Sequence, residues 1–273
     1  MRSVKEILKD NNFRFNKQFG QNFITDTNLL GSMVQDAKIT KDDVVVEIGP
    51  GAGTLTREIA KACKKVYSFE IDRNLKPILE ESLKGIDNSQ VIFKDIQKVS
   101  EDELKETIGG GNYKVVANLP YYITTPIIMR FLESDYKPES ITIMIQKEVA
   151  ERLVSKEGTE EFGAITLSIA LDGEVCITRN VSREMFMPMP NVDSAIVRID
   201  LNDKYKDVDK KKVKRVIKAA FSMRRKTLVN NIISNFDIKR DAIEKVLCDM
   251  GLDPRVRGEA LDIDKYIELS NKI

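Results

Sequence analysis

A glycine-rich turn follows the first strongly apolar run of the chain. The run Val44–Ile48 includes Glu47 and leads into Gly49, Gly51 and Gly53. Glycines let the backbone approach a ligand closely, and such turns bind ligands at the carboxyl edge of parallel sheets. NAD is the obvious alternative, but here the third glycine falls two residues after the second, not three, and an acidic residue precedes the turn. This pattern favours S-adenosylmethionine, which has no phosphates for a helix N-terminus to hold.

Two carboxylates end the next two predicted strands. Glu70 lies about twenty residues after the turn, where a carboxylate could accept hydrogen bonds from both ribose hydroxyls. Asp95 could accept the exocyclic amine of adenine, with Ile71 and Ile96 as apolar walls for the ring. Each carboxylate alone could equally be a solvated charge at a strand end. Three consecutive strand ends that each present a suitable group favour a cofactor site.

The fourth predicted strand ends in the tetrad Asn118-Leu119-Pro120-Tyr121. An adenine amine is a poor nucleophile because its lone pair is delocalised into the ring. The Asn118 side-chain oxygen and the Leu119 carbonyl, exposed where Pro120 turns the chain, could accept its protons, and Tyr121 could stack on the base. Methyl transfer would then need positioning and electrostatics but no strong base. The alternative is a polar turn whose tyrosine covers the core, but the glycine turn and the carboxylates favour chemistry.

The composition excludes several other kinds of catalyst. The 273 residues include no histidine, which rules out Ser-His-Asp and Cys-His systems, histidine metal sites and an imidazole base. Cys63, Cys176 and Cys248 are far apart, so we expect buried thiols and no metal. The chain has no apolar run near the ~20 residues of a membrane span, and its start lacks a secretory signal. These features predict a cytoplasmic protein with no membrane partner.

The elements that would position these residues form a repeating α/β pattern. Short β-branched runs alternate with helical segments, which predicts βαβ units and a buried parallel sheet. Thr125 is the predicted N-cap of the helix after the tetrad, with Pro126 at its first position. The β-rich runs Ala164–Ala170 and Asp193–Ile199 could close the far edge of the sheet. The other predicted strands are Val44–Ile48, Lys65–Glu70, Gln90–Phe93, Lys114–Ala117 and Ile141–Ile145.

Near residue 203 the composition changes to polar helical segments. An apolar stripe with helical spacing runs from Val213 to Phe221. We therefore predict an α/β domain over residues 1–202 and a small all-α domain over residues 203–273.

A basic block lies in the predicted helical domain. The net charge of the chain is only +1, yet residues 210–226 include many lysines and arginines and no acidic residue. Such a block indicates a polyanionic partner, or it is simply a solvated helix face. Arg224, Arg225 and Lys226 are the stronger candidates for phosphate contacts because they lie between two apolar helical segments.

Together these motifs resemble the ribosomal RNA adenine N6,N6-dimethyltransferases, and among them the small-subunit branch. Large-subunit enzymes of the macrolide-resistance type share the glycine turn and a similar tetrad, so these two motifs do not separate the branches. The stretches Phe186–Ala195 and Phe221–Leu228 favour the small-subunit branch. Tyr122 departs from the pattern, since many relatives have asparagine there. The resemblance covers nearly the whole chain and rests on Lys17–Phe23, Glu47–Gly53, Asp95, Asn118–Tyr121 with Thr124–Pro126, Phe186–Ala195 and Phe221–Leu228.

The resemblance implies a Rossmann-like class I methyltransferase sheet followed by the small all-α domain. It implies that S-adenosylmethionine methylates N6 of two adjacent adenosines near the 3′ end of small-subunit rRNA. The implied partner is this rRNA within a pre-assembled small ribosomal subunit, and we expect a monomer. The resemblance also adds Asn22 and Ile24 to the cofactor site beside Gly49, Gly51, Glu70, Asp95 and Asn118. A structural factor in ribosome assembly, or a methyltransferase for small molecules or proteins, is the alternative.

Overall fold

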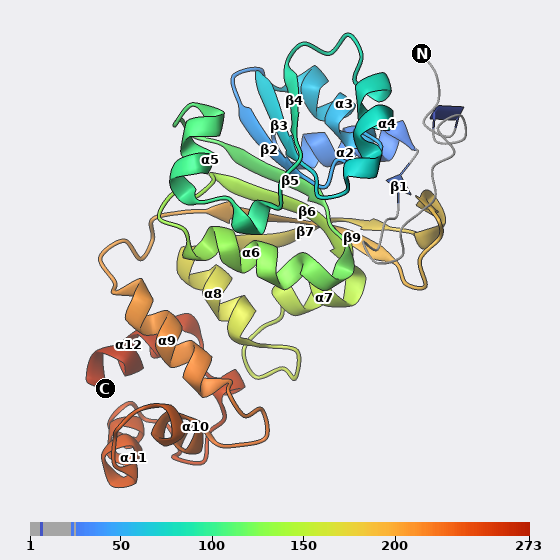
Figure 1. Cartoon of the computed structure of the whole chain (residues 1–273). Helices are drawn as coiled ribbons and strands as arrows, with labels where there is room; N and C mark the ends of the chain where they lie inside the picture. The colour runs from blue at the N-terminus through green and yellow to red at the C-terminus, as the bar shows by residue number, and fades with distance from the viewer. Residues whose placement is uncertain (1–5, 8–22, 25) are drawn as a thin grey trace. The chain divides into compact units, whose positions relative to one another are not determined.

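The computed structural model describes residues 6–7, 23–24 and 26–273. Its main strands are β2 (Val44–Ile48), β3 (Lys65–Phe69), β4 (Ser89–Ile92), β5 (Lys114–Asn118), β6 (Ser140–Gln146), β7 (Gly173–Val181) and β9 (Ser194–Leu201). Within the described residues these form one seven-stranded sheet in the order β4-β3-β2-β5-β6-β9-β7 (Figure 1). Strands β4, β3, β2, β5 and β6 run parallel, and β9 runs antiparallel to β6. The predicted α/β sheet is confirmed.

Helices cover the sheet, so its central strands are buried on both faces. Val45 and Val46 of β2 and Val115 and Val116 of β5 are inaccessible to solvent, as the β-branched runs of a covered parallel sheet should be. Two helices pack on one face through a shared apolar core, α2 (Thr27–Asp36) and α3 (Thr54–Ala62). The next helices along the chain are α4 (Lys76–Ser82), α5 (Glu101–Ile108), α6 (Thr124–Glu133) and α7 (Lys147–Leu153).

A second, two-stranded sheet brings an early segment beside a late one. Strand β1 (Phe23–Ile24) pairs antiparallel with β8 (Phe186–Met187), so that Phe23 lies opposite Met187 and Ile24 opposite Phe186. Short 3-10 turns follow several strand ends: η2 (Arg73–Leu75), η3 (Ile96–Lys98), η4 (Tyr121–Ile123) and η5 (Arg183–Met185).

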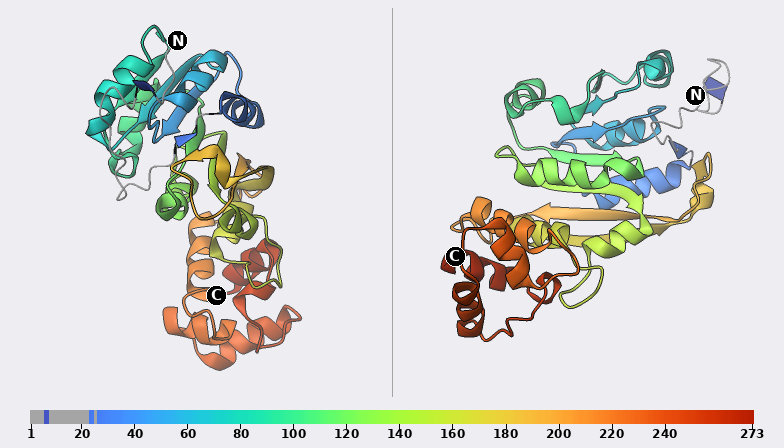
Figure 2. Two further views of the ribbon diagram at one scale, coloured as in Figure 1. Left: turned by 90° about the vertical axis from the view of Figure 1, so that its right-hand side faces the viewer. Right: turned by 60° about the horizontal axis from the view of Figure 1, so that its bottom comes forward.

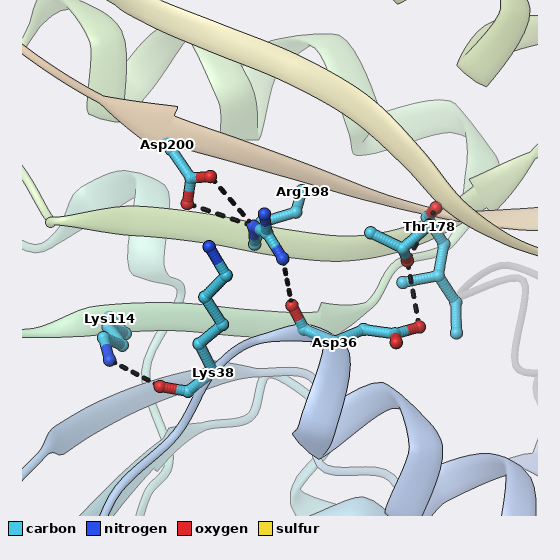
Figure 3. Close-up of polar contacts among 7 residues, drawn as sticks. Asp36, Lys38, Lys114, Thr178, Arg198 and Asp200 are labelled. Carbon is cyan, nitrogen blue, oxygen red and sulfur yellow. Dashed lines mark hydrogen bonds and ion pairs between the residues drawn. The ribbon is translucent and has the colours of Figure 1, made fainter.

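Polar contacts fix the C-terminal end of α2 against the sheet (Figure 3). Arg198 of β9 donates to the Asp36 carbonyl at 2.8 Å, and Thr178 of β7 donates to the Asp36 carboxylate at 3.0 Å. Lys114 of β5 donates to the carbonyl of Lys38 at 2.7 Å, just after the helix, where Lys38 has a φ of 51°. The bond from Arg198 satisfies a carbonyl that the helix end itself leaves without a partner. Through these contacts, three strands hold α2 in place.

The chain divides into two compact units, which we describe separately. The first comprises residues 1–150 and 176–201, and the second comprises residues 151–175 and 202–273. The predicted boundary near residue 203 falls close to the second junction, while residues 151–175 cluster with the C-terminal helices.

The second unit is helical and has its own core. Its helices are α8 (Ala164–Asp172), α9 (Lys210–Ala220), α10 (Leu228–Asn235), α11 (Arg240–Asp249) and α12 (Ile263–Lys272), with the turn η6 (Gly258–Ala260). The apolar stripe predicted in α9 packs with Leu228 of α10 and Tyr266 of α12. In both views of Figure 2 the orange and red helices form one compact group.

Two local predictions are wrong. Ala164–Ala170 is not a strand but most of α8, whose buried residues lie all around the helix, so the sequence shows no amphipathic period to separate it from a buried strand. The edge strand is β7 instead. Thr125 is not an N-cap, because η4 leads directly into α6, which begins at Thr124 with Ile123 at the cap position.

The prediction for the cysteines holds only in part. Cys63 is buried, but Cys176 and Cys248 are exposed. Cys176 lies in the edge strand β7, where alternate side chains point to solvent.

Candidate active site

A cavity of about 270 Å³ opens at the carboxyl ends of β2, β3 and β5. Ligands bind at this edge in open α/β sheets because the βα turns meet there. The cavity is formed within the first unit, and its walls come from the glycine turn, the following strand ends, the tetrad and the β1–β8 pair. The predicted site residues that line it are Ile24, Gly49, Gly51, Glu70, Asp95, Asn118, Leu119, Pro120 and Tyr121. Asn22 lies outside the described residues.

The glycine turn adopts backbone conformations that other residues disfavour. Gly49, Gly51 and Gly53 have φ values of 67°, 57° and 82°, and Gly53 caps α3 in the left-handed region. A Cβ atom on Gly51 would lie 2.8 Å from the ring of Phe23, whereas a Cβ on Gly49 would meet no atom within 4 Å. The turn therefore leaves open space above Gly49, while Gly51 lets Phe23 of β1 pack against it.

Glu70 receives three backbone hydrogen bonds at the end of β3. Its Oε1 accepts from the N–H groups of Ile71 and Asp72, both at 2.8 Å, and its Oε2 accepts from Gly51 N–H at 3.2 Å. Burial raises the pKa of Glu70, and these three donors oppose that effect. One acceptor position remains on Oε2. Acceptance of two ribose hydroxyls, as expected, would therefore require the second hydroxyl to displace one of the backbone donors or to add a third hydrogen bond to one oxygen.

Glu47 does not line the cavity, although the sequence places it beside the glycine turn. It is fully buried in β2, and its Oε2 accepts from Ser68 of β3 at 2.6 Å and from Thr56 of α3 at 2.7 Å. Its Oε1 has no hydrogen-bond partner within the described residues. Burial raises the pKa of Glu47 to about 7, and the nearby charge of Glu70 acts in the same direction. Glu47 thus connects β2, β3 and α3 beneath the turn.

Asp95 begins the 3-10 turn after β4. Its Oδ1 accepts from Gln97 N–H at 3.0 Å and so fixes the carboxylate at the cavity wall. Ile96 is buried and Ile71 is 46% exposed, and both line the cavity as expected for the walls of a flat ring. The position can accept a hydrogen bond from an adenine amine.

The tetrad extends from the end of β5 into η4. Asn118 lies opposite Met144 of β6 in the parallel ladder, and Leu119 N–H donates to the Met144 carbonyl at 3.2 Å. All four tetrad residues line the cavity. The Tyr121 hydroxyl lies 3.0 Å from Oγ of Ser194, and Tyr122 lines the cavity mouth with 59% of its surface exposed.

Among the residues that sequence reasoning did not assign to the site, three depend on pairing between distant segments. Phe23 and Phe186 line the cavity, and Ser194 contacts Tyr121. Phe186 and Ser194 lie in the stretch Phe186–Ala195, which drew attention only through the family resemblance. Their contacts depend on pairing between distant segments, so no local pattern could have identified them.

The candidate RNA contacts lie in the second unit. Arg224, Arg225 and Lys226 are exposed in the turn between α9 and α10. Arg224 donates to the Glu160 carbonyl at 2.9 Å and forms an exposed ion pair with its carboxylate at 3.4 Å. The turn therefore presents three cations close together.

Two features are absent from the part of the chain that the structure describes. None of the helices in that part has both the length and the apolar character needed to cross a membrane. The acidic and cysteine side chains of the described residues form no cluster of three that could hold a metal ion.

The fold and the cavity are those of a Rossmann-like class I methyltransferase. The residues present fit S-adenosylmethionine, because glycines leave room in the turn and two fixed carboxylates face the cavity. The family model for ribosomal RNA adenine dimethylase matches residues 12–271. The chain belongs to this family.

Similar proteins agree with this assignment. The chain is 43% identical to the ribosomal RNA small subunit methyltransferase A of Clostridioides difficile (strain 630) and 41% identical to that of Bacillus cytotoxicus, in each case over 99% of this chain and 95% of the relative. Its fold resembles a dimethyladenosine transferase from Plasmodium falciparum, with a TM-score of 0.76 at 24% identity over 90% of this chain and 95% of that one. The 23S rRNA methyltransferase ErmE gives a TM-score of 0.68 at 24% identity over 92% and 98%.

Proposed function

We propose that this protein methylates N6 of two adjacent adenosines near the 3′ end of small-subunit rRNA to give N6,N6-dimethyladenosine. The chain is an S-adenosylmethionine-dependent rRNA adenine dimethyltransferase. The observation that carries the proposal is the cavity that the glycine turn, two strand-end carboxylates and the tetrad line together. The small-subunit names of relatives at 41–43% identity support this target over the large subunit.

At one end of the cavity, two carboxylates would bind S-adenosylmethionine. S-adenosylmethionine supplies an electrophilic methyl group. Glu70, whose Oε2 accepts only from Gly51 N–H among the described residues, would accept from a ribose hydroxyl, and Asp95, which Gln97 N–H fixes, would accept from the adenine amine. Ile71 and Ile96, which line the cavity, would cover the faces of the adenine ring.

The tetrad end of the cavity holds the target adenine. The Asn118 side-chain oxygen and the Leu119 carbonyl accept the two protons of N6, which favours a pyramidal nitrogen with its lone pair toward the methyl group. Tyr121 stacks on the base, a contact that is worth about 1–3 kcal/mol in nucleic-acid complexes. The proton leaves readily once the nitrogen is alkylated, so the absence of histidine from the sequence is no obstacle. A base inside a duplex could not enter, so the target adenine must be unpaired or flipped out.

Some cations of the basic block in the second unit contact other side chains of that unit, and others are exposed to solvent. Lys210 and Lys214 lie 3.0 and 2.6 Å from the fully buried carboxylate of Asp172. Arg215 lies over the ring of Phe236 at 4.8 Å. These three side chains have structural roles, which supports the turn at Arg224, Arg225 and Lys226 as the phosphate-binding part. The Arg224 pair with Glu160 is exposed, and exposed pairs contribute little, so a phosphate can replace it.

Three features of the biological setting also belong to the proposal. We expect the substrate to be a pre-assembled small ribosomal subunit, the active form to be a monomer, and the location to be the cytoplasm. The substrate and the location follow from the proposed target, because adenosines in a ribosomal subunit are reached where subunits assemble.

Transfer of labelled methyl groups tests the proposed function. Small subunits from cells that lack the modification should accept label from S-adenosylmethionine at two adjacent adenosines, while large subunits and free small molecules should not. Asn118→Ala should abolish transfer and keep the fold, as judged by circular dichroism. Label in the large subunit, or substantial turnover by Asn118→Ala, would contradict the assignment.

Charge reversal of Arg224, Arg225 and Lys226 tests the RNA contact separately. We expect a higher KM for RNA and a flatter salt dependence, by about one unit of log–log slope for each phosphate that the variant no longer neutralises. Affinity for S-adenosylmethionine should not change. Reversal of Lys239, an exposed cation at the cap of α11, is a single-site control for charge reversal elsewhere in this unit, to be compared with reversal of Arg225 alone. An unchanged salt slope in the triple variant would count against the phosphate role.

A further inference from the structure

A hydrogen bond connects the tetrad to a strand that lies two positions away in the sheet. The hydroxyl of Tyr121 lies 3.0 Å from Oγ of Ser194, and either oxygen can donate. Tyr121 follows β5, whereas Ser194 is the first residue of β9 and lies opposite Gln146 of β6. The bond therefore crosses above β6 and joins segments more than 70 residues apart.

Ser194 is a fixed anchor for this bond. Its side chain is completely buried, and its backbone belongs to the β6–β9 ladder. The preceding residue is held twice, because the Asp193 carbonyl accepts from Lys147 N–H and the Asp193 carboxylate accepts from Arg183 N–H, both at 3.0 Å. The backbone that carries the Ser194 hydroxyl is therefore fixed, so the hydroxyl is a stationary partner for Tyr121.

Tyr121 needs such an anchor. It lies in η4, a single turn whose cap position is Pro120 and which no side chain caps, and its ring is only partly buried at the cavity wall. A hydrogen bond at the far end of the ring fixes both side-chain torsions. Rotation of an unanchored ring would change the tilt and height of the surface on which a base stacks.

We propose that Ser194 is a positioning residue that orients the Tyr121 ring for the target adenine. The inference rests on the proposed function, in which Tyr121 stacks on the base. Ser194 does not touch the substrate. It acts through the Tyr121 hydroxyl, which keeps the ring in the geometry that aligns N6 with the methyl group, and small misalignments of reacting atoms slow such a step strongly.

A double-mutant cycle isolates this role. Ser194→Ala and Tyr121→Phe each remove one hydroxyl, and Tyr121→Phe keeps the aromatic ring. We expect each variant to lower the rate of methyl transfer at saturating RNA and cofactor by about three- to tenfold, the usual range for one neutral hydrogen bond. The double variant should be no slower than either single variant. Affinity for S-adenosylmethionine should stay within about twofold of wild type.

Ser140→Ala is the matched control, because it removes another buried serine hydroxyl, from the opposite end of β6. It should leave the transfer rate unchanged, which separates positioning from a general effect of deleting a buried hydroxyl.

Two results would overturn the inference. One is a Tyr121→Phe variant with the wild-type rate, which is informative even if Ser194→Ala does not fold. The other is a double variant that is slower than Tyr121→Phe alone, by about the same factor as Ser194→Ala slows the wild-type protein. Failure of the proposed function would look different, because the wild-type protein would then transfer no label to rRNA at all.

Discussion

The buried carboxyl of Glu47 predicts that stability decreases as pH rises toward neutrality. In the folded chain the pKa of Glu47 is about 7, against an ordinary value of 4.5. The folded protein therefore binds more protons than the unfolded chain between these two pH values. Since the slope of stability with pH follows this difference in bound protons, the free energy of unfolding should fall from pH 4.5 to pH 7 and level off above it.

The size of this decrease follows from the two pKa values. At about 1.4 kcal/mol for each factor of ten, raising the pKa from 4.5 to about 7 corresponds to a loss of about 3 kcal/mol. Glu47→Gln should remove it, because an amide does not ionise. Its oxygen can still accept from Ser68 and Thr56, while its NH₂ group takes the place of the unpartnered Oε1. That change adds a constant offset to stability without adding a dependence on pH.

Urea unfolding followed by circular dichroism, from pH 4 to pH 8.5, measures the effect. The difference in stability between wild type and Glu47→Gln should change by about 3 kcal/mol across the window, in favour of the variant at high pH. Glu80→Gln removes an exposed carboxylate of α4 and controls for the change in net charge. Parallel curves for wild type and Glu47→Gln would refute the reasoning, since the carboxyl would then ionise without a burial penalty.

Two further predictions follow from close contacts. Gly51→Ala should weaken S-adenosylmethionine binding about tenfold or more, because the residue has a positive φ and its Cβ would lie 2.8 Å from Phe23. Binding calorimetry measures this loss. Gly85→Ala is the control and should show no such loss, since Gly85 also has a positive φ but has open space around it. Asp172→Ala should destabilise the helical unit by about 3–5 kcal/mol in thermal unfolding, because it removes the buried carboxylate that pairs with Lys210 and Lys214. The surface variant Asp253→Ala should have little effect, and an equal loss from both variants would argue against a special role for the buried carboxylate.

The sheet and most of the cavity could be predicted because their signals are local. The strand β2 is a short β-branched run, and the glycine turn and tetrad follow strand ends directly. Helix α8 could not be predicted, since its apolar residues surround the helix and show no period. The role of Glu47 depends on Ser68 and Thr56, which become its neighbours only when β3 and α3 pack against β2.

The stretch Phe186–Ala195 shows why a motif far from the tetrad in sequence belongs to the same site. At its start, Phe186 pairs with Ile24, and both line the cavity. Near its end, Ser194 holds the ring of Tyr121. One segment therefore contacts both the wall formed by β1 and the wall formed by the tetrad, so a change in its length between these contacts should disturb both walls together. Because the two contacts lie at opposite ends of Phe186–Ala195, the residues between them must keep the right length and path. This is a physical reason for a long motif that contains no catalytic group of its own.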